Sequence, residues 1–144
     1  MKKINLPIAA LFLGALFSAN TCSENSTGNA ANAAAARGKW ELASIGGQAI
    51  NLPAGAQRPF LNIDSLGRNV SGFAGCNQLF GSVALRGDSL SFPGLASTKM
   101  YCREAAQLED GFLQALNATR TFAINGNELV LKAGKDLAVL RRTE

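Results

Sequence analysis

The residues of this chain best suited to covalent chemistry are its three cysteines, Cys22, Cys76 and Cys102. Cys76 lies in the glycine-rich stretch Gly72–Gly81, where it could be a nucleophile, a metal ligand or half of a disulfide. A nucleophilic Cys or Ser needs a neighbouring base, which in the common dyads and triads is His. The chain contains no histidine, so these reactions and every His-ligated metal site are excluded. Two thiols alone supply too few ligands for a metal centre.

Other catalytic arrangements have weaker support in the sequence. Ser97 and Lys99 are near neighbours, but no wider motif surrounds them. The acidic residues fall mostly at expected turns or on exposed strand faces, and the pair Glu109–Asp110 is expected on the solvent-facing side of a helix. None has the spacing of a calcium-binding loop. We therefore expect a non-enzymatic protein with no catalytic residue, no cofactor and no metal site.

Residues 1–21 have the pattern of an export signal. Lys2 and Lys3 precede an apolar run that is too short, and too interrupted by Pro and Gly, to be read as a membrane span. Cys22 follows this run at the distance expected of a lipidated cysteine, although the residues before it match the usual lipoprotein motif poorly. The alternative is cleavage after Ala19, which leaves Cys22 as a spare thiol. We favour a lipid anchor at Cys22, and hence an exported protein of the bacterial cell envelope, on the outer membrane or facing the periplasm.

The segment 22–37 is rich in Ala, Asn and Ser and has no large apolar residue to bury. It cannot offset the entropy of ordering, so we expect a flexible low-complexity tether. The remaining segment, 38–144, suits one domain with one hydrophobic core.

The charge of the exported chain gives no sign of a nucleic-acid partner. Of 14 basic and 10 acidic residues, Lys2 and Lys3 belong to the signal, which leaves 12 basic residues and a net charge of +2. These basic residues are scattered, whereas nucleic-acid binding requires Lys and Arg gathered on one face. We therefore expect no nucleic-acid partner, and contact with a membrane through the lipid anchor.

Cys76 and Cys102 are the two cysteines within the folded part of the chain. An exported protein meets an oxidising compartment, in which a disulfide between them is the expected outcome. The surrounding residues suit a sharp break between two strands. We expect Gly72 and Gly75 to let the backbone bend, Gly81 to relieve crowding, and Asn77 to cap the turn with its side chain.

Hydrophobic alternation and turn residues predict many short strands and one helix. The strands are expected at 38–45, 48–52, 60–64, 69–73, 77–85, 89–92, 119–124, 128–133 and 136–142. Apolar residues at helical spacing, Leu108, Phe112 and Leu116, predict a helix over 103–118. This pattern favours a mainly β (α+β) fold, a small antiparallel barrel or strongly curved sheet that carries one helix.

Four segments occur in a characteristic order: "GKWELASIGG", "RNVSGFAGCNQLFGSV", "LASTKMYC" and "LEDGFLQALNATRTFAINGNELVL". Together they resemble the META/HslJ-like domain of bacterial envelope lipoproteins, across 38–142. The resemblance assigns motif positions to Trp40, Leu42, Gly72, Gly75, Cys76, Asn77, Gly81, Thr98, Met100 and Cys102.

The resemblance implies a domain of lipocalin-like topology over 38–144, and it agrees with a Cys76–Cys102 disulfide. Some family members are associated with heat induction and novobiocin resistance, and no enzymatic activity transfers with the family. Our leading hypothesis is therefore a non-enzymatic, membrane-tethered envelope domain with a stress-related or structural role.

Two other functions remain open from the sequence. One is a lipocalin-like module that holds a small apolar ligand inside the barrel, and the other is an inhibitor or partner-binding protein that uses the loop Pro53–Pro59. In a domain of this size phenylalanines more often fill the core than line a ligand site. The five in question are Phe60, Phe73, Phe80, Phe92 and Phe122.

Overall fold

A computed structural model of the chain describes residues 26–143. The elements are α1 (Ser26–Ala35), β1 (Gly38–Ile45), β2 (Gln48–Ala49), β3 (Phe60–Ile63), β4 (Asn69–Phe73), β5 (Gln78–Ser82), β6 (Ala84–Arg86), β7 (Ser89–Ser91), β8 (Ala96–Ser97), α2 (Ala106–Ala118), β9 (Thr121–Asn125), β10 (Glu128–Lys132) and β11 (Asp136–Arg142). The export signal and Cys22 lie outside the described residues.

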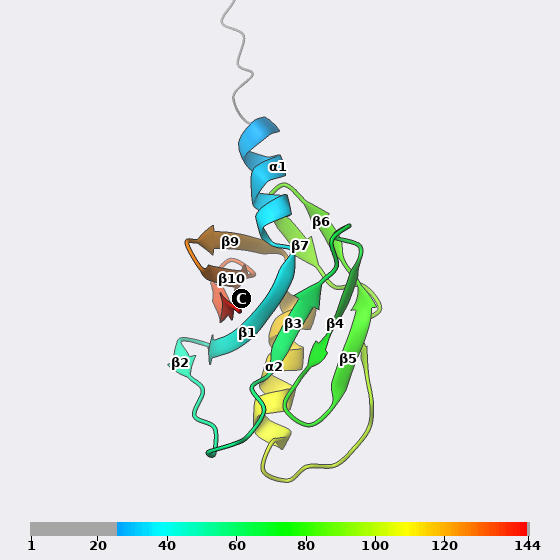
Figure 1. Cartoon of the computed structure of the whole chain (residues 1–144), viewed down its shortest axis with the longest axis vertical. Coiled ribbons are helices and arrows are strands. Elements are labelled where there is room, and N and C mark those ends of the chain that lie inside the picture. Colours follow the sequence, from blue (N-terminus) through cyan, green and yellow to red (C-terminus); the bar gives the residue numbers. More distant parts are fainter. Residues whose placement is uncertain (1–25, 144) are drawn as a thin grey trace, which may run out of the picture.

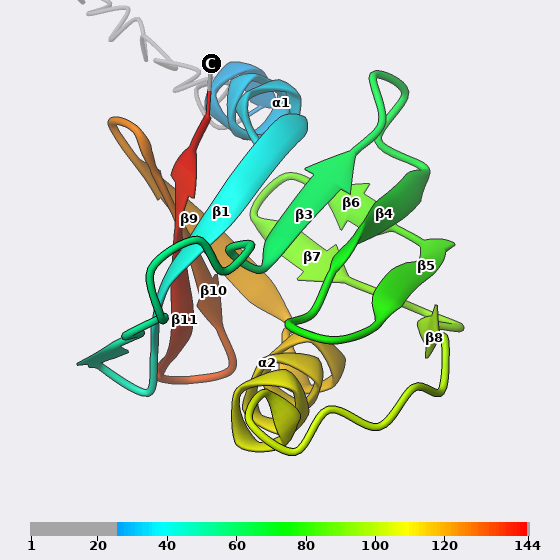
Figure 2. The ribbon, with the colours of Figure 1, turned by 60° about the horizontal axis from the view of Figure 1, so that its bottom comes forward.

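One antiparallel sheet contains all of the strands. Its order is β6-β7-β9-β10-β11-β1-β3-β4-β5-β8, with β2 paired to β1 alone. Figure 2 shows the sheet curling on itself, with β9, β10 and β11 on one side, β3, β4 and β5 on the other, and β1 passing between them. The expected mainly β fold, a small antiparallel lipocalin-like barrel or curved sheet, is confirmed.

A bend in one segment brings the two ends of the sheet together. The sequence pattern predicts a single strand over 77–85, but the structure divides it into β5 and β6, which are separated only by Val83. The Val83 amide donates to the Arg68 carbonyl (2.7 Å), which holds the bend against the β3–β4 hairpin. Because β6 begins the strand order and β5 lies next to its end, this bend joins the two ends of the sheet covalently.

The interior of the curled sheet is filled by apolar side chains. Alternation along the strands turns Trp40 and Leu42 of β1 inward, and the covering helix α2 adds Phe112 and Leu116. The largest fully buried side chains are Trp40, Phe112, Leu42, Leu61, Ile63, Leu79, Leu90, Leu116, Leu129, Leu131, Leu140 and Thr119. One continuous core therefore joins the strands of both sides to α2.

The five phenylalanines singled out from the sequence have different environments. Phe92 and Phe122 are buried in the core, whereas Phe60 and Phe73 are half-buried. Phe80 is wrong as a core or ligand-lining residue, because it is 53% exposed. Its neighbour Leu79 points inward, so strand alternation turns Phe80 to the outer face of β5.

The described end of the expected tether is a helix. In place of a flexible segment over 22–37, residues Ser26–Ala35 form α1, which projects from one end of the barrel (Figure 1). Its end is fastened to the domain, since Ala36 is fully buried and the Trp40 indole N–H donates to the Ala36 carbonyl (2.8 Å). None of the helices in residues 26–143 is long and apolar enough to cross a bilayer.

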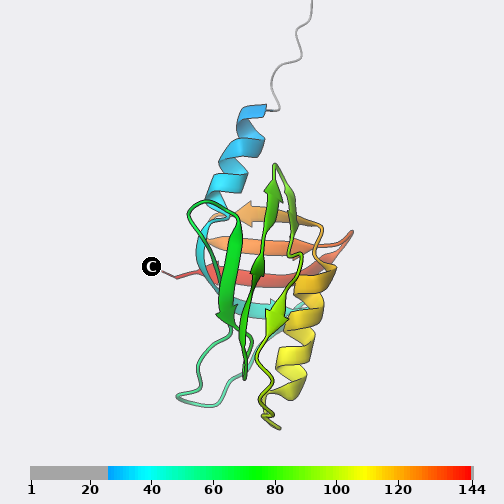
Figure 3. The same ribbon diagram turned by 90° about the vertical axis from the view of Figure 1, so that its right-hand side faces the viewer.

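An arginine from the last strand also holds the end of α1. The Arg142 guanidinium lies 4.2 Å from the centre of the Trp40 ring and donates to the carbonyls of Arg37 (3.1 Å) and Ala35. The last carbonyls of a helix have no partner within the helix and carry partial negative charge, so a cation at this position stabilises them. Figure 3 shows α1 and the start of α2 at opposite ends of the barrel.

Candidate functional site

The glycine-rich stretch forms a tight corner between β4 and β5, and a disulfide joins this corner to the segment before α2. Cys76 and Cys102 are bonded, with a sequence separation of 26 and 5.9 Å between their Cα atoms. The expected disulfide is therefore confirmed. Gly75, just before Cys76, has a φ of +130°, which only glycine adopts without strain.

Asn77 connects the corner to the segment 98–100. Its side-chain oxygen accepts from the Thr98 hydroxyl (2.7 Å) and from the Met100 amide (2.7 Å). Its side-chain nitrogen donates to the Met100 carbonyl (3.0 Å) and to Glu109 Oε1 (2.7 Å). The turn itself is closed by a backbone bond from Ala74 N–H to the Asn77 carbonyl, so the expectation that the Asn77 side chain caps the turn is wrong. The amide instead joins three segments of the chain.

Glu109 is the partner that sequence reasoning missed. Its Oε2 accepts from the backbone N–H groups of Cys76 (2.9 Å) and Asn77 (2.7 Å), while Oε1 accepts from the Asn77 side chain. The carboxylate is buried, with only 9% of the residue exposed. It also lies in the first turn of α2, where the helix dipole favours a negative charge.

The expected solvent-facing position of Glu109 is therefore wrong, although its neighbour Asp110 is exposed as expected. The signal was present in the spacing. Glu109 precedes Phe112 by three residues and Leu116 by seven, which places all three on one face of the helix. A carboxylate on the apolar face needs a buried partner, and the N–H groups of the corner supply it.

Two glycines of the motif allow close approach of neighbouring backbone. Gly72 pairs with Leu61, and a Cβ there would collide with the Phe60 carbonyl oxygen. At Gly81, a Cβ would lie 3.0 Å from the Leu95 Cα, so the expectation that Gly81 relieves crowding agrees with the packing. Gly72 is needed for space rather than for a bend, since its φ is not positive.

The structure brings most of the motif together but leaves two members elsewhere. Gly72, Gly75, Cys76, Asn77 and Gly81 run through β4, the corner and β5, and the segment with Thr98, Met100 and Cys102 is bonded to that corner. Trp40 and Leu42 instead lie in β1 and fill the core. The motif thus contains one polar cluster and one packing anchor.

The polar cluster consists of Asn77, Glu109 and their hydrogen-bond partners, and these groups bond to one another. Every side-chain polar atom of Asn77 and Glu109 has a partner within the protein. Such an arrangement fixes the corner to α2, and it offers no free base. Among residues 26–143 no group of three His, Cys, Asp or Glu side chains is placed to hold a metal ion. Cys22, the expected lipidation site, lies outside these residues.

Beside the corner is a groove, bounded by the loop 50–57, the start of α2 and the end of β4. Its volume is about 260 Å³. The lining residues are Ile50, Asn51, Leu52, Pro53, Ala56, Gln57, Phe73, Gly75, Glu104, Ala105 and Leu108. Two exposed apolar residues, Met100 (62%) and Tyr101 (81%), lie in the segment that leads to Cys102.

Comparison with known proteins identifies relatives by sequence and by fold. A family model described as the META domain matches residues 33–144, which is more than half of the chain and begins within α1. No curated protein matches the chain.

Two solved structures are similar in fold. One NMR structure of a protein is 21% identical, covers 73% of this chain and 88% of its own, and superposes with a TM-score of 0.58. An NMR structure of a protein from Burkholderia xenovorans is 32% identical, covers 74% of this chain and 81% of its own, and has a TM-score of 0.56. The two neighbours are thus little longer than the domain that they share with this chain.

Proposed function

This chain belongs to the META domain family, and we propose that it works as a non-enzymatic, exported domain of the bacterial cell envelope, tethered to a membrane through a lipid on Cys22. The observation that carries the proposal is the Cys76–Cys102 disulfide. Disulfides persist in oxidising compartments and are rare in the cytosol, and this bridge joins the corner held by Glu109 to the segment before α2. The export pattern of residues 1–21 supports the same location.

The absence of enzymatic activity is supported by how the polar residues are used. The chain has no histidine, and the buried carboxylate of Glu109 accepts hydrogen bonds from the corner. The three bonds that hold this carboxylate come from the protein itself. A structural or stress-related role, such as tolerance of heat or antibiotics, fits a rigid domain of this kind.

A carrier with its ligand inside the barrel is less well supported. The interior positions that a ligand would need are occupied by Trp40, Leu61, Phe112 and Leu140, all fully buried. With these positions filled by side chains, a ligand could enter the interior only if the core rearranged. Binding at the outer surface remains compatible with the proposed location.

Lipid attachment tests the tether. The full chain is produced in a bacterium that is fed an alkyne-labelled palmitate, and label on the protein is compared between the natural chain and Cys22→Ala. We expect labelled protein in the membrane fraction for the natural chain and no label for the variant. Equal labelling of both would end the lipoprotein proposal, and cleavage after Ala19 would appear as an unlabelled, shortened chain.

The redox state of the bridge tests export separately. Peptides of the protein isolated from cells without reductant, with free thiols blocked at lysis, should contain Cys76 and Cys102 as one cross-linked pair. Free thiols at both positions would exclude an oxidising location. A deletion strain challenged with heat and with antibiotics, including novobiocin, then tests the stress role, with the natural gene and the Cys22→Ala variant as complementing copies.

A further inference from the structure

The groove beside the disulfide corner has the composition of a small-molecule site. Such sites are mostly apolar and carry a few polar groups that orient the ligand. Here Ile50, Leu52, Phe73 and Leu108 are among the apolar lining residues, and Glu104 is the only ionisable one. The volume of about 260 Å³ suits a compact ligand rather than a long chain.

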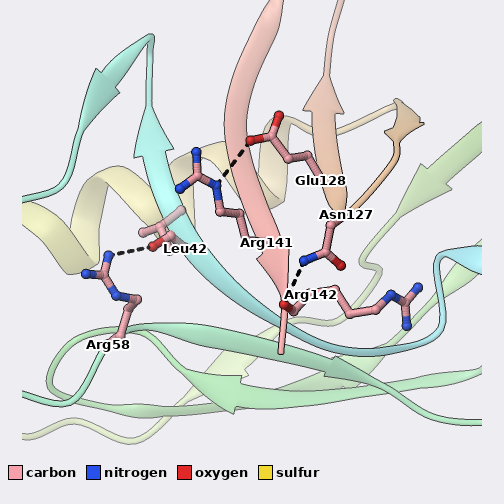
Figure 4. A network of polar contacts seen from close by, with 6 residues as sticks. All are labelled: Leu42, Arg58, Asn127, Glu128, Arg141 and Arg142. Carbon is pink, nitrogen blue, oxygen red and sulfur yellow. Dashed lines mark hydrogen bonds and ion pairs between the residues drawn. The ribbon is translucent and has the colours of Figure 1, made fainter. Parts of the chain in front are cut away.

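One wall of the groove is a loop held firmly at both ends. The Ile50 amide donates to the Ala43 carbonyl (3.0 Å), and the Leu42 amide donates to the Pro59 carbonyl (2.9 Å). Figure 4 shows a third attachment, in which the Arg58 guanidinium donates to the Leu42 carbonyl (3.2 Å). The loop is therefore fastened to β1 at both ends by hydrogen bonds within the protein.

The opposite wall is fixed by the polar cluster. Glu104 and Ala105 directly precede α2, Leu108 lies in its first turn, and Phe73 and Gly75 also line the groove. Directly beyond Gly75, the amides of the corner bond to Glu109 of the same helix, and the disulfide joins the two segments again. A site with both walls held in place binds without the entropy cost of ordering them.

We propose that this groove binds a small apolar molecule that carries one positive charge. Its apolar body would pack on Phe73, Leu108 and the loop, and its cation would lie near the exposed Glu104 carboxylate at the rim. An anion would meet Glu104 as a like charge, and a neutral molecule would gain the apolar contacts alone. The cluster around Asn77 and Glu109 then serves to hold the site open.

The test uses residues 26–144 and three matched probes. The shared fold makes up 88% and 81% of the two neighbours solved by NMR, and every residue of the hydrophobic core lies within 26–144. The probes are 2-(2-naphthyl)ethylammonium, 2-(2-naphthyl)ethanol and 2-naphthylacetate, which share a ring system and differ in charge. Amide chemical shifts are followed during titration. We expect the shifts to centre on Phe73, Gly75 and Leu108, with affinity in the order cation, alcohol, anion.

Two pairs of variants separate the groove from general surface binding. Ala56→Trp fills the groove and should weaken binding of the cation by about tenfold or more, as steric exclusion from an apolar pocket does. Ala54→Trp, in the same loop but outside the lining, should leave it unchanged. Glu104→Gln should lower the preference for cation over alcohol by about 1.5- to 5-fold, the range for exposed ion pairs, whereas Asp110→Asn should not.

The proposal fails if shifts cluster elsewhere, if no probe shifts the groove residues at millimolar concentration, or if the anion binds as tightly as the cation. It also fails if Ala56→Trp binds like the natural chain. None of these outcomes bears on lipid attachment at Cys22, since the tested unit lacks that residue. The groove and the tether can therefore be refuted independently.

Discussion

Replacing Glu109 by Ala removes the carboxylate that holds the disulfide corner against α2. Three N–H groups lose their acceptor, those of the Cys76 and Asn77 backbone and of the Asn77 side chain, at 2.9, 2.7 and 2.7 Å. Hydrogen bonds to charged groups contribute about 1.5–3 kcal/mol each, so the three together set an upper range of about 4.5–9 kcal/mol.

The expected loss of stability lies below this range. Removing the carboxylate also removes the cost of keeping a charge away from water, so the net loss is smaller than the sum of the three hydrogen bonds. We expect Glu109→Ala to lower the free energy of unfolding by about 3–4 kcal/mol, a large effect for a small domain. Glu109→Gln keeps the shape but offers fewer acceptors, so we expect a loss of about 1–3 kcal/mol.

Guanidinium denaturation at pH 7 without reductant measures these differences, with fluorescence of Trp40, the single tryptophan, as the probe. Asp110→Ala is the matched control, because it removes an exposed acid from the next position of the same helix and should change stability by less than about 0.5 kcal/mol. Equal stabilities of Glu109→Ala and Asp110→Ala would show that the buried carboxylate does not hold the corner. If Glu109→Ala does not fold, the stability of Glu109→Gln is compared with that of Asp110→Ala instead.

Three further predictions concern the bridge, the glycines and one titrating turn. Replacing both cysteines of the disulfide by Ala should lower stability by about 3.5 kcal/mol, the chain-entropy value for a separation of 26 residues, as measured by denaturation against the oxidised natural chain. Gly72→Ala should destabilise by about 1–3 kcal/mol because its Cβ has no space. Gly111→Ala should stabilise by up to about 1 kcal/mol in the same assay, because Gly111 lies inside α2 and its Cβ would make only an ordinary contact with the Ile45 side chain of β1. The pKa of Asp64 lies below its ordinary value because its carboxylate accepts hydrogen bonds from the Arg68 backbone N–H and the Asn69 side chain. The contribution of Asp64 to stability is therefore full above the unfolded-state pKa and is lost as the pH falls through the folded-state pKa. Carbon-detected NMR titration should show this lowered midpoint, and Asn69→Ala should raise it; an unchanged midpoint would contradict the assignment.

Part of this protein follows from local sequence alone. The alternation of apolar residues along a strand, such as Trp40 and Leu42 in β1, depends only on which face of the strand is buried. The turn residues between strands depend on backbone preference. The pairing of Cys76 with Cys102 followed from two domain cysteines in a chain whose sequence pattern predicts export. Each of these features has few alternatives, so residue type and spacing were sufficient to predict it.

Other features needed the tertiary structure because they depend on what approaches from far along the chain. The bend at Val83 divides one continuous segment into β5 and β6, which lie at opposite ends of the curled sheet. No local feature of the sequence indicated this bend. The end of α1 is held by Trp40 and Arg142. Arg142 lies 107 and 105 residues after Ala35 and Arg37, the residues whose carbonyls it binds. Its composition alone predicted a flexible segment, since isolated short helices are marginal in water.

Glu109 shows most clearly where local sequence stops being sufficient and the tertiary structure decides. Its spacing from Phe112 and Leu116 placed it on the buried face, but charge alone argued for solvent. Only the fold supplies the three N–H groups that make burial of a carboxylate favourable, and they come from residues 32 and 33 positions away. The sequence by itself determined most of the strands, the bridge and the family. The tertiary structure decided which polar groups meet, because that depends on long-range packing rather than on local preference.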